Sequence, residues 1–140
     1  MPIWARSLIL LATGAIQSPS VYKGLEITVK GVERAVNVSL QDCPPGDNIV
    51  RGVIRPGEQN EFATVSIEVK VLPSFAPVPL PKPVLYDEAD KPYKTAQSFG
   101  ELNASPSSYS CAFSFRVPRG VKLSRFAIGD ASFDVSSFDK

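Results

Sequence analysis

Three acidic residues that lie close together, Asp87, Glu88 and Asp90, come nearest to a reactive or metal-binding site in this sequence. Hard cations such as Ca²⁺ take several oxygen ligands from one loop, so these carboxylates are candidate metal ligands. A calcium loop of the EF-hand type that began at Asp87 would need oxygen ligands at positions 89 and 91 and a glycine at position 92. The chain has alanine, lysine and proline there, so the pattern favours a solvated turn between two strands.

Catalytic combinations are restricted because the sequence contains no histidine. Ser-His-Asp catalysis, Cys-His catalysis and histidine-based zinc sites are therefore excluded. Ser20 and Lys23 have the Ser-x-x-Lys spacing of acylating serine enzymes, but the companion motifs of that class are missing, which makes the spacing a chance match. We expect no enzyme and no cofactor; a carboxylate-dependent hydrolase is a remote alternative for which no particular pair of acids is indicated.

The two cysteines, Cys43 and Cys111, are the other candidate site. Two cysteines are too few for a zinc or iron–sulfur centre, and in a secreted protein an even number predicts a disulfide. They lie 68 residues apart, and closing such a loop would stabilise the fold by about 4 kcal/mol in the chain-entropy account. The alternative is two unpaired thiols, as expected of a cytosolic protein.

Apolar residues recur at every second position in three segments, which is the pattern of half-buried β-strands. In residues 64–72 valine or isoleucine alternates with serine, glutamate and lysine, and residues 24–32 repeat the pattern. In residues 109–117 an apolar face alternates with a face that contains serines and an arginine. Cys111 has the phase of Phe113 and Phe115, so we expect it to point into the core.

Weaker strand patterns occupy residues 35–40, 48–54, 84–87, 123–129 and 131–138. Turn sequences rich in proline, glycine, asparagine and serine separate them. Outside the N-terminal region, residues 95–103 are the single candidate helix, and Gly100 interrupts it. We predict an all-β fold, a two-sheet antiparallel β-sandwich of about seven to nine strands, in which each sheet has one wet and one dry face.

Prolines occupy every second position from Pro77 to Pro83. Proline donates no N–H and fixes φ, so this run is extended and cannot be a central strand. Ligands of proline-binding grooves usually have prolines three apart, and a linker here would leave two halves too small to fold alone. We predict a stiff crossover, from one sheet to the other or along an edge, between the strand ending at Leu72 and the strand starting near Val84.

Residues 1–20 have the features of a secretory signal peptide: one basic residue, Arg6, then an apolar run from Leu8 to Ile16, then small residues. The run is shorter than the roughly 20 residues that span a bilayer. We predict cleavage after a residue between Ala15 and Ser20, which leaves residues 21–140 as one domain without a membrane span. The alternative is a cytosolic protein whose apolar N-terminus is a strand or a short helix.

The charge of the chain is nearly balanced, with 15 basic and 14 acidic residues. No large positive field results, so nucleic acid is not expected as a partner. Asn37 and Asn103 begin Asn-x-Ser patterns, which matter as glycosylation sites only in a eukaryotic host. Trp4, the single tryptophan, lies in the predicted signal segment, so an aromatic sugar platform would depend on tyrosine or phenylalanine.

The order of several features resembles a known family. An alternating-valine strand at residues 65–71 precedes a strand that ends in an aspartate, a turn and an aromatic residue, here Leu85, Asp87 and Tyr93. A later strand ends in Phe-x-Val-Pro at residues 115–118, an apolar run follows at 123–128, and residues 25–35 match the family's first strand. In these features the sequence resembles the secreted and membrane-tethered immunoglobulin-like domains of unknown function that are widespread in bacteria.

The resemblance covers roughly residues 25–135 and implies an immunoglobulin-like sandwich outside the cytoplasm, with no catalytic residues to carry over. The chain departs from the family pattern after the valine strand, where "PSFAPVP" replaces the usual asparagine-containing turn.

These features together predict a secreted or periplasmic, non-catalytic module that binds a protein or a surface polymer. Loops on a rigid sandwich commonly carry function, so residues 42–48, 56–61 and 87–92 are candidate contact surfaces. The alternative is a structural subunit of an envelope assembly, joined to its neighbours by strand addition at an open sheet edge.

Overall fold

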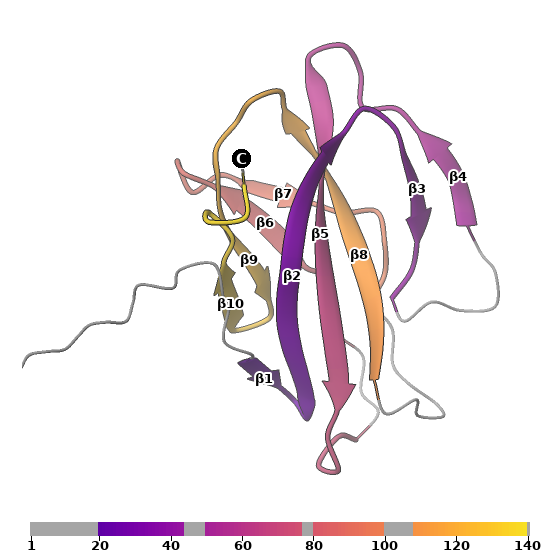
Figure 1. Ribbon diagram of the computed structural model, residues 1–140, viewed down its shortest axis with the longest axis vertical. Helices are drawn as coiled ribbons and strands as arrows, with labels where there is room; N and C mark the ends of the chain where they lie inside the picture. Colours follow the sequence, from indigo (N-terminus) through magenta and orange to yellow (C-terminus); the bar gives the residue numbers. More distant parts are fainter. Residues whose placement is uncertain (1–19, 44–49, 77–79, 100–107, 140) are drawn as a thin grey trace, which may run out of the picture.

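The computed structural model describes residues 20–43, 50–76, 80–99 and 108–139. In these residues the chain forms ten β-strands and no helix, arranged as two four-stranded sheets and a two-stranded ribbon (Figure 1). All pairings within the two large sheets are antiparallel, so the predicted all-β, two-sheet architecture is confirmed. No helix in this part of the chain is long and apolar enough to cross a membrane.

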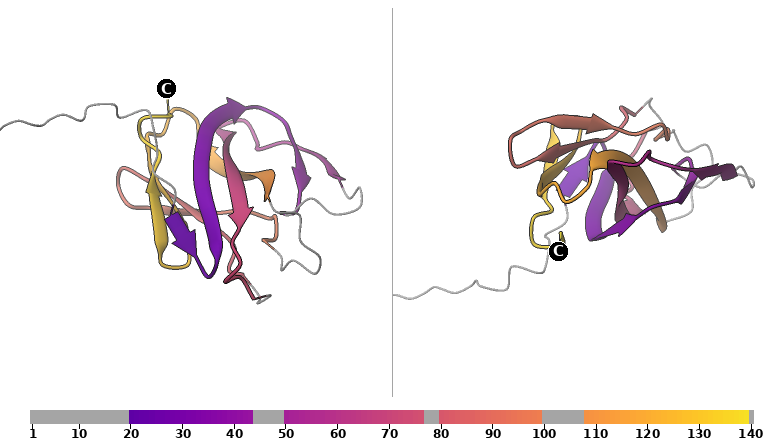
Figure 2. Two further views of the ribbon diagram at one scale, coloured as in Figure 1. Left: turned by 60° about the horizontal axis from the view of Figure 1, so that its bottom comes forward. Right: turned by 90° about the horizontal axis from the view of Figure 1, so that it is seen from above.

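The first sheet has the strand order β1-β2-β5-β8 and the second has the order β10-β9-β6-β7. The first sheet contains β1 (Ser20–Tyr22), β2 (Leu25–Ala35), β5 (Asn60–Val71) and β8 (Ser108–Pro118). The second sheet contains β6 (Val84–Asp87), β7 (Pro92–Lys94), β9 (Leu123–Ile128) and β10 (Ala131–Asp134). The ribbon pairs β3 (Val38–Gln41) with β4 (Val50–Ile54), and Figure 2 shows it projecting from one side of the sandwich. The strand patterns in the sequence miss β1 and β7, because three residues are too few to show a period.

The long strands of the first sheet follow the predicted alternation. On β5, Val65, Ile67 and Val69 are buried, and the residues between them face outward with partial or full exposure. β8 pairs with β5 in unbroken register over its whole length. Its Phe113 and Phe115 are fully buried, as their phase predicts.

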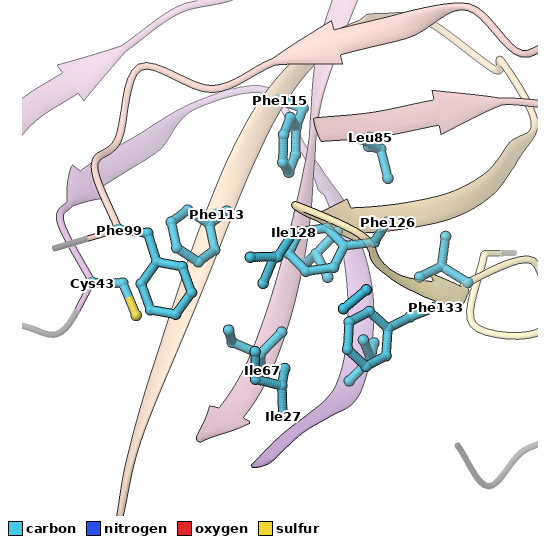
Figure 3. Packing of buried hydrophobic residues seen from close by; sticks show 14 of the residues in the cluster. Ile27, Cys43, Ile67, Leu85, Phe99, Phe113, Phe115, Phe126, Ile128 and Phe133 are labelled. Atoms are coloured by element: carbon cyan, nitrogen blue, oxygen red, sulfur yellow. The ribbon is translucent and has the colours of Figure 1, made fainter. Parts of the chain in front are cut away.

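The core lies between the two sheets and is centred on aromatic rings (Figure 3). The ring centroid of Phe126 on β9 lies 6.3 Å from that of Phe113 and 6.1 Å from those of Phe115 and Phe133. Phe99 packs edge to face against Phe113, with 5.7 Å between the centroids. Side chains from both sheets and from the segment after β7 therefore meet at one place.

The proline-rich segment connects the two sheets. β5 ends at Val71 in the first sheet, and the next strand, β6, starts at Val84 in the second. The predicted crossover between sheets is confirmed by this topology. Pro83 is buried immediately before β6, whereas residues 77–79 of the segment lie outside the described residues.

A β-bulge in β2 changes which side chains face the core. The pairing of β2 with β5 shifts directly after Val29. One extra residue at this point moves every later side chain of the strand to the opposite face of the sheet. Glu33 consequently lies on the outer face, whereas Arg34 forms ion pairs, each at 2.8 Å, with Glu61 and with Asp139 near the end of the chain.

Candidate functional site

The acidic residues identified in the sequence form the turn between β6 and β7. Asp87 is the last residue of β6 and is only 5% exposed. Its Oδ1 atom accepts hydrogen bonds from the backbone N–H groups of Ala89 and Lys91, each at 2.9 Å. Its Oδ2 atom accepts a hydrogen bond from the hydroxyl group of Tyr93 at 2.8 Å. Both oxygens of this carboxylate therefore hold the hairpin together.

The other two carboxylates of the turn do not join Asp87 in a common site. Glu88 is exposed, and Asp90 forms an ion pair at 3.0 Å with Arg125, whose guanidinium group lies 3.6 Å over the ring centroid of Tyr86. Among the described residues, no group of three or more His, Cys, Asp or Glu side chains is placed to hold a metal ion. The arrangement gives Asp87 a role in organising the turn.

The surroundings of Asp87 and Tyr93 in this turn shift the pKa values of both side chains. The backbone N–H of Lys91 and the hydroxyl of Tyr93 lower the pKa of Asp87 below its ordinary value of 3.8, because both favour the ionised carboxylate. Burial, together with the neighbouring Asp87, raises the pKa of Tyr93 to about 12. Asp87 is thus ionised and Tyr93 is protonated at neutral pH.

Acid is expected to destabilise the protein through Asp87. A carboxyl group whose pKa is lower in the folded than in the unfolded state stabilises the fold above its unfolded pKa, and this stabilisation is lost as the pH falls through the folded pKa. The free energy of unfolding is measured by urea unfolding at several pH values. As the pH is lowered from neutral to about 3, it should fall more for the parent protein than for Asp87→Asn. Glu88→Gln is the control and should behave like the parent. Equal losses in the parent and in Asp87→Asn would contradict the assignment.

The disulfide between Cys43 and Cys111 ties the ribbon to the first sheet and confirms the predicted pairing. Cys43 follows the end of β3 and is fully buried, whereas Cys111 on β8 is partly buried and packs against the core. The Cα atoms of the two residues are 5.7 Å apart. The N–H of Cys43 also donates a hydrogen bond to the carbonyl of Ser98 at 2.9 Å, and Cys43 forms a parallel bridge with Phe99. This corner fixes the end of β3 against β8.

Gln97, which the sequence did not single out, is the most highly connected polar side chain at this corner. It is 2% exposed, and its side-chain N–H groups donate to the carbonyls of Gln41 at 2.7 Å and Ala112 at 2.6 Å. Its Oε1 atom accepts from the N–H of Ser114 at 2.6 Å and from the hydroxyl of Thr95 at 3.2 Å. No local pattern marks this residue, because most of its partners are backbone groups of strands distant in the sequence.

A groove of about 600 Å³ lies between β3 and the outer face of the first sheet. β3 lies beside β8, as Figure 1 shows, and residues of β2, β3, β5 and β8 line the groove, which we call the β3–β8 groove. Glu33 and Asp42 contribute carboxylates to its lining. The lining otherwise consists mainly of hydroxyl and amide side chains, from Asn37, Ser39, Gln41, Thr64, Ser110 and Ser114.

The β3–β8 groove is suited to hydrogen bonding rather than to aromatic stacking. None of its described lining residues is aromatic, and none is a lysine or a histidine that could deprotonate a hydroxyl group. The hydroxyl groups of Thr64 and Ser114 bond each other at 2.8 Å, and Asp42 accepts a hydrogen bond from the N–H of Ser98 at 2.8 Å. The groove therefore offers a ligand donors and acceptors from several strands.

The other predicted positions are distributed over the molecule. Asn37 is exposed in the lining of the groove, whereas Asn103 and residues 44–48 of the first candidate loop lie outside the described residues. The predicted signal segment also lies outside them, except that Ser20 is the first residue of β1. Residues 56–61 lead from β4 into β5, and residues 87–92 are the acidic turn.

Comparison with known proteins gives a likeness of fold only. No protein family and no curated protein matches the sequence. Among solved structures, the chain is similar to an uncharacterised β-sandwich protein from Clostridium difficile 630, with a TM-score of 0.51 and 9% sequence identity over 84% of this chain and 87% of that one. This likeness agrees with the arrangement of the two sheets: the chain is a β-sandwich protein.

Proposed function

We propose that this chain is a secreted, non-catalytic binding module that recognises a protein or a surface polymer through the β3–β8 groove. The observation that carries the proposal is the groove itself, in which hydroxyl, amide and carboxylate groups from four strands gather on one open surface. Pockets for small molecules are mostly apolar and enclose their ligand. A polar, open groove suits a longer ligand that bonds at several points.

The strand order supports an immunoglobulin-like domain. β5 and β6 are consecutive strands in different sheets, as are β8 and β9, and β5 pairs with β8 while β6 pairs with β9. In immunoglobulin domains, strand B lies beside E in one sheet and strand C lies beside F in the other. β10 and β7 then take the positions of strands G and C′. The disulfide differs from the usual B–F bridge, because it joins β8 to the segment after β3.

Export is supported by two independent features. Disulfides persist mainly in oxidising compartments outside the cytoplasm, and the Cys43–Cys111 bridge holds the ribbon that forms one wall of the groove. Residues 1–20 have the signal-peptide pattern of one basic residue, an apolar run and small residues. Both features favour a target that the protein meets outside the cytoplasm.

Arginine substitutions within the groove test the proposal. Ser39 on β3 and Ser110 on β8 are exposed serines on opposite walls, so Ser39→Arg and Ser110→Arg fill the groove without disturbing the core. Ser132→Arg, at an exposed serine of β10, is the matched control. Labelled protein is titrated onto intact cells of its own host, and the apparent dissociation constant should rise by about tenfold or more for the groove variants only.

Two results would contradict the proposal. One is equal binding by the parent, the groove variants and Ser132→Arg. The other is the absence of saturable binding by the parent protein.

A further inference from the structure

β8 is the edge strand of the first sheet, and half of its backbone groups face away from β5. In an antiparallel pair, successive residues alternately bond the partner strand and face away from it. The C=O of Ala112 and the N–H of Ser114 bond Gln97, so the even-numbered residues of β8 direct these groups away from β5. β8 pairs with β5 without interruption, so the backbone N–H and C=O of Ser110, which lines the groove, also point away from β5. No described residue bonds the N–H of Ala112 or the backbone groups of Ser110.

The side-chain amide of Gln97 makes the hydrogen bonds that a neighbouring strand would make. It accepts from the N–H of Ser114 and donates to the C=O of Ala112, each at 2.6 Å, as the C=O and N–H of one residue in a parallel neighbouring strand would do. Its other N–H reaches the carbonyl of Gln41 on β3 at 2.7 Å. Gln97 therefore occupies the space between β3 and β8 beside Ala112 and Ser114. The Cys43–Cys111 bridge joins the same two segments on the core side of the sheet.

We propose that the β3–β8 groove accepts an extended peptide segment of a partner protein, which bonds the backbone of β8 at Ser110 and Ala112 and lies beside β3. Gln97 closes one end of the groove. This inference rests on the proposed function and deepens it by naming the class of ligand. In strand addition, main-chain hydrogen bonds provide affinity and the neighbouring side chains provide specificity.

The charges of the groove favour a basic residue in the peptide. Glu33 is exposed in the lining, on the outer face of β2. Arg34, the basic residue among the described lining residues, is engaged by Glu61 and Asp139, neither of which lines the groove. A lysine or arginine in the bound segment would therefore face Glu33 without competition from a free cation on the groove wall.

Selection from a displayed library of random linear peptides of about ten residues, on the oxidised and immobilised protein, tests the inference. The enriched peptides are synthesised and titrated. Ser110→Pro removes an N–H that does not bond β5, a change that edge strands tolerate, and should weaken peptide binding by about tenfold or more. Arg116→Pro is the matched control, because Arg116 has the same phase on β8 but lies outside the groove lining.

N-methylation of the peptide gives a second test that does not depend on the folding of Ser110→Pro. The peptide is methylated at alternate amides in two frames, and one frame alone should abolish binding, because alternate N–H groups of a strand face the same neighbour. Equal effects of the two frames, or peptide binding that Ser110→Pro leaves unchanged in a folded protein, would overturn the inference.

Failure to enrich any peptide would also overturn the inference. If Ser39→Arg still abolished binding to host cells in that case, the proposed function would stand with a surface polymer as the ligand. If Ser39→Arg had no effect on the cells either, the proposed function would fail as well.

Discussion

Replacing Phe126 by alanine is expected to lower the free energy of unfolding by about 3–5 kcal/mol. Phe126 is fully buried, and its ring contacts those of Phe113 and Phe115 on β8 and of Phe133 on β10. Alanine would remove most of the apolar side chain of Phe126 where the two sheets meet and leave a cavity among the neighbouring rings, which cannot close it fully. Urea unfolding followed by circular dichroism measures the loss.

The same substitution at Phe138 provides the control for Phe126. Phe138 is partly buried and packs at the border of the core, so Phe138→Ala should lose clearly less stability than Phe126→Ala. Equal losses in the two variants would mean that the aromatic cluster is not the centre of the core.

Removing the disulfide is expected to lower the free energy of unfolding by about 4 kcal/mol. The bridge closes a loop across a separation of 68 residues, and its loss would free a long segment in the unfolded chain. The double variant Cys43→Ala/Cys111→Ala is used because Cys43 is fully buried, and serine at this position would bury a hydroxyl group. Urea unfolding of the oxidised parent and of the double variant measures the difference.

Reduction of the parent protein is the internal control for the disulfide prediction. A reducing agent should destabilise the parent by a similar amount and should leave the double variant unchanged. Because the bridge anchors the end of β3 to β8, both forms should also lose affinity for the target of the groove. A loss of less than about 1 kcal/mol in the double variant would contradict the entropic account.

The strands of this fold could be predicted where the alternation of apolar and polar residues is long and one face of the strand is exposed to solvent. β5 and β8 show the period of two over most of their length, so their inward and outward faces are evident in the sequence. The Cys43–Cys111 pairing could be predicted because the chain contains only these two cysteines. The proline segment indicated a crossover because its prolines donate no N–H and fix φ, which excludes a central strand.

The groove could not be predicted, because it depends on contacts between distant residues. The bulge after Val29, which moves Glu33 and Arg34 to the opposite faces of β2, depends on the pairing of β2 with β5. Gln97 lies in a stretch that suggested a short helix, and the structure instead buries it between β3 and β8. In the sequence, Asp87 is one of three neighbouring acids that are candidate metal ligands. In the structure, its hydrogen bonds, including the one from Tyr93, show that it organises a turn.

A map of backbone amide signals during ligand binding tests recognition by the β3–β8 groove most directly. The ¹⁵N-labelled, oxidised protein is titrated with the solubilised surface fraction of its host's cells, and its amide signals are followed by nuclear magnetic resonance. The account predicts that the signals of Ser39, Ser110 and Ala112 shift, while those of Ser132 and Asp134 on the far edge of the second sheet do not. Shifts confined to the second sheet, or none at saturating amounts of the surface fraction, would contradict it.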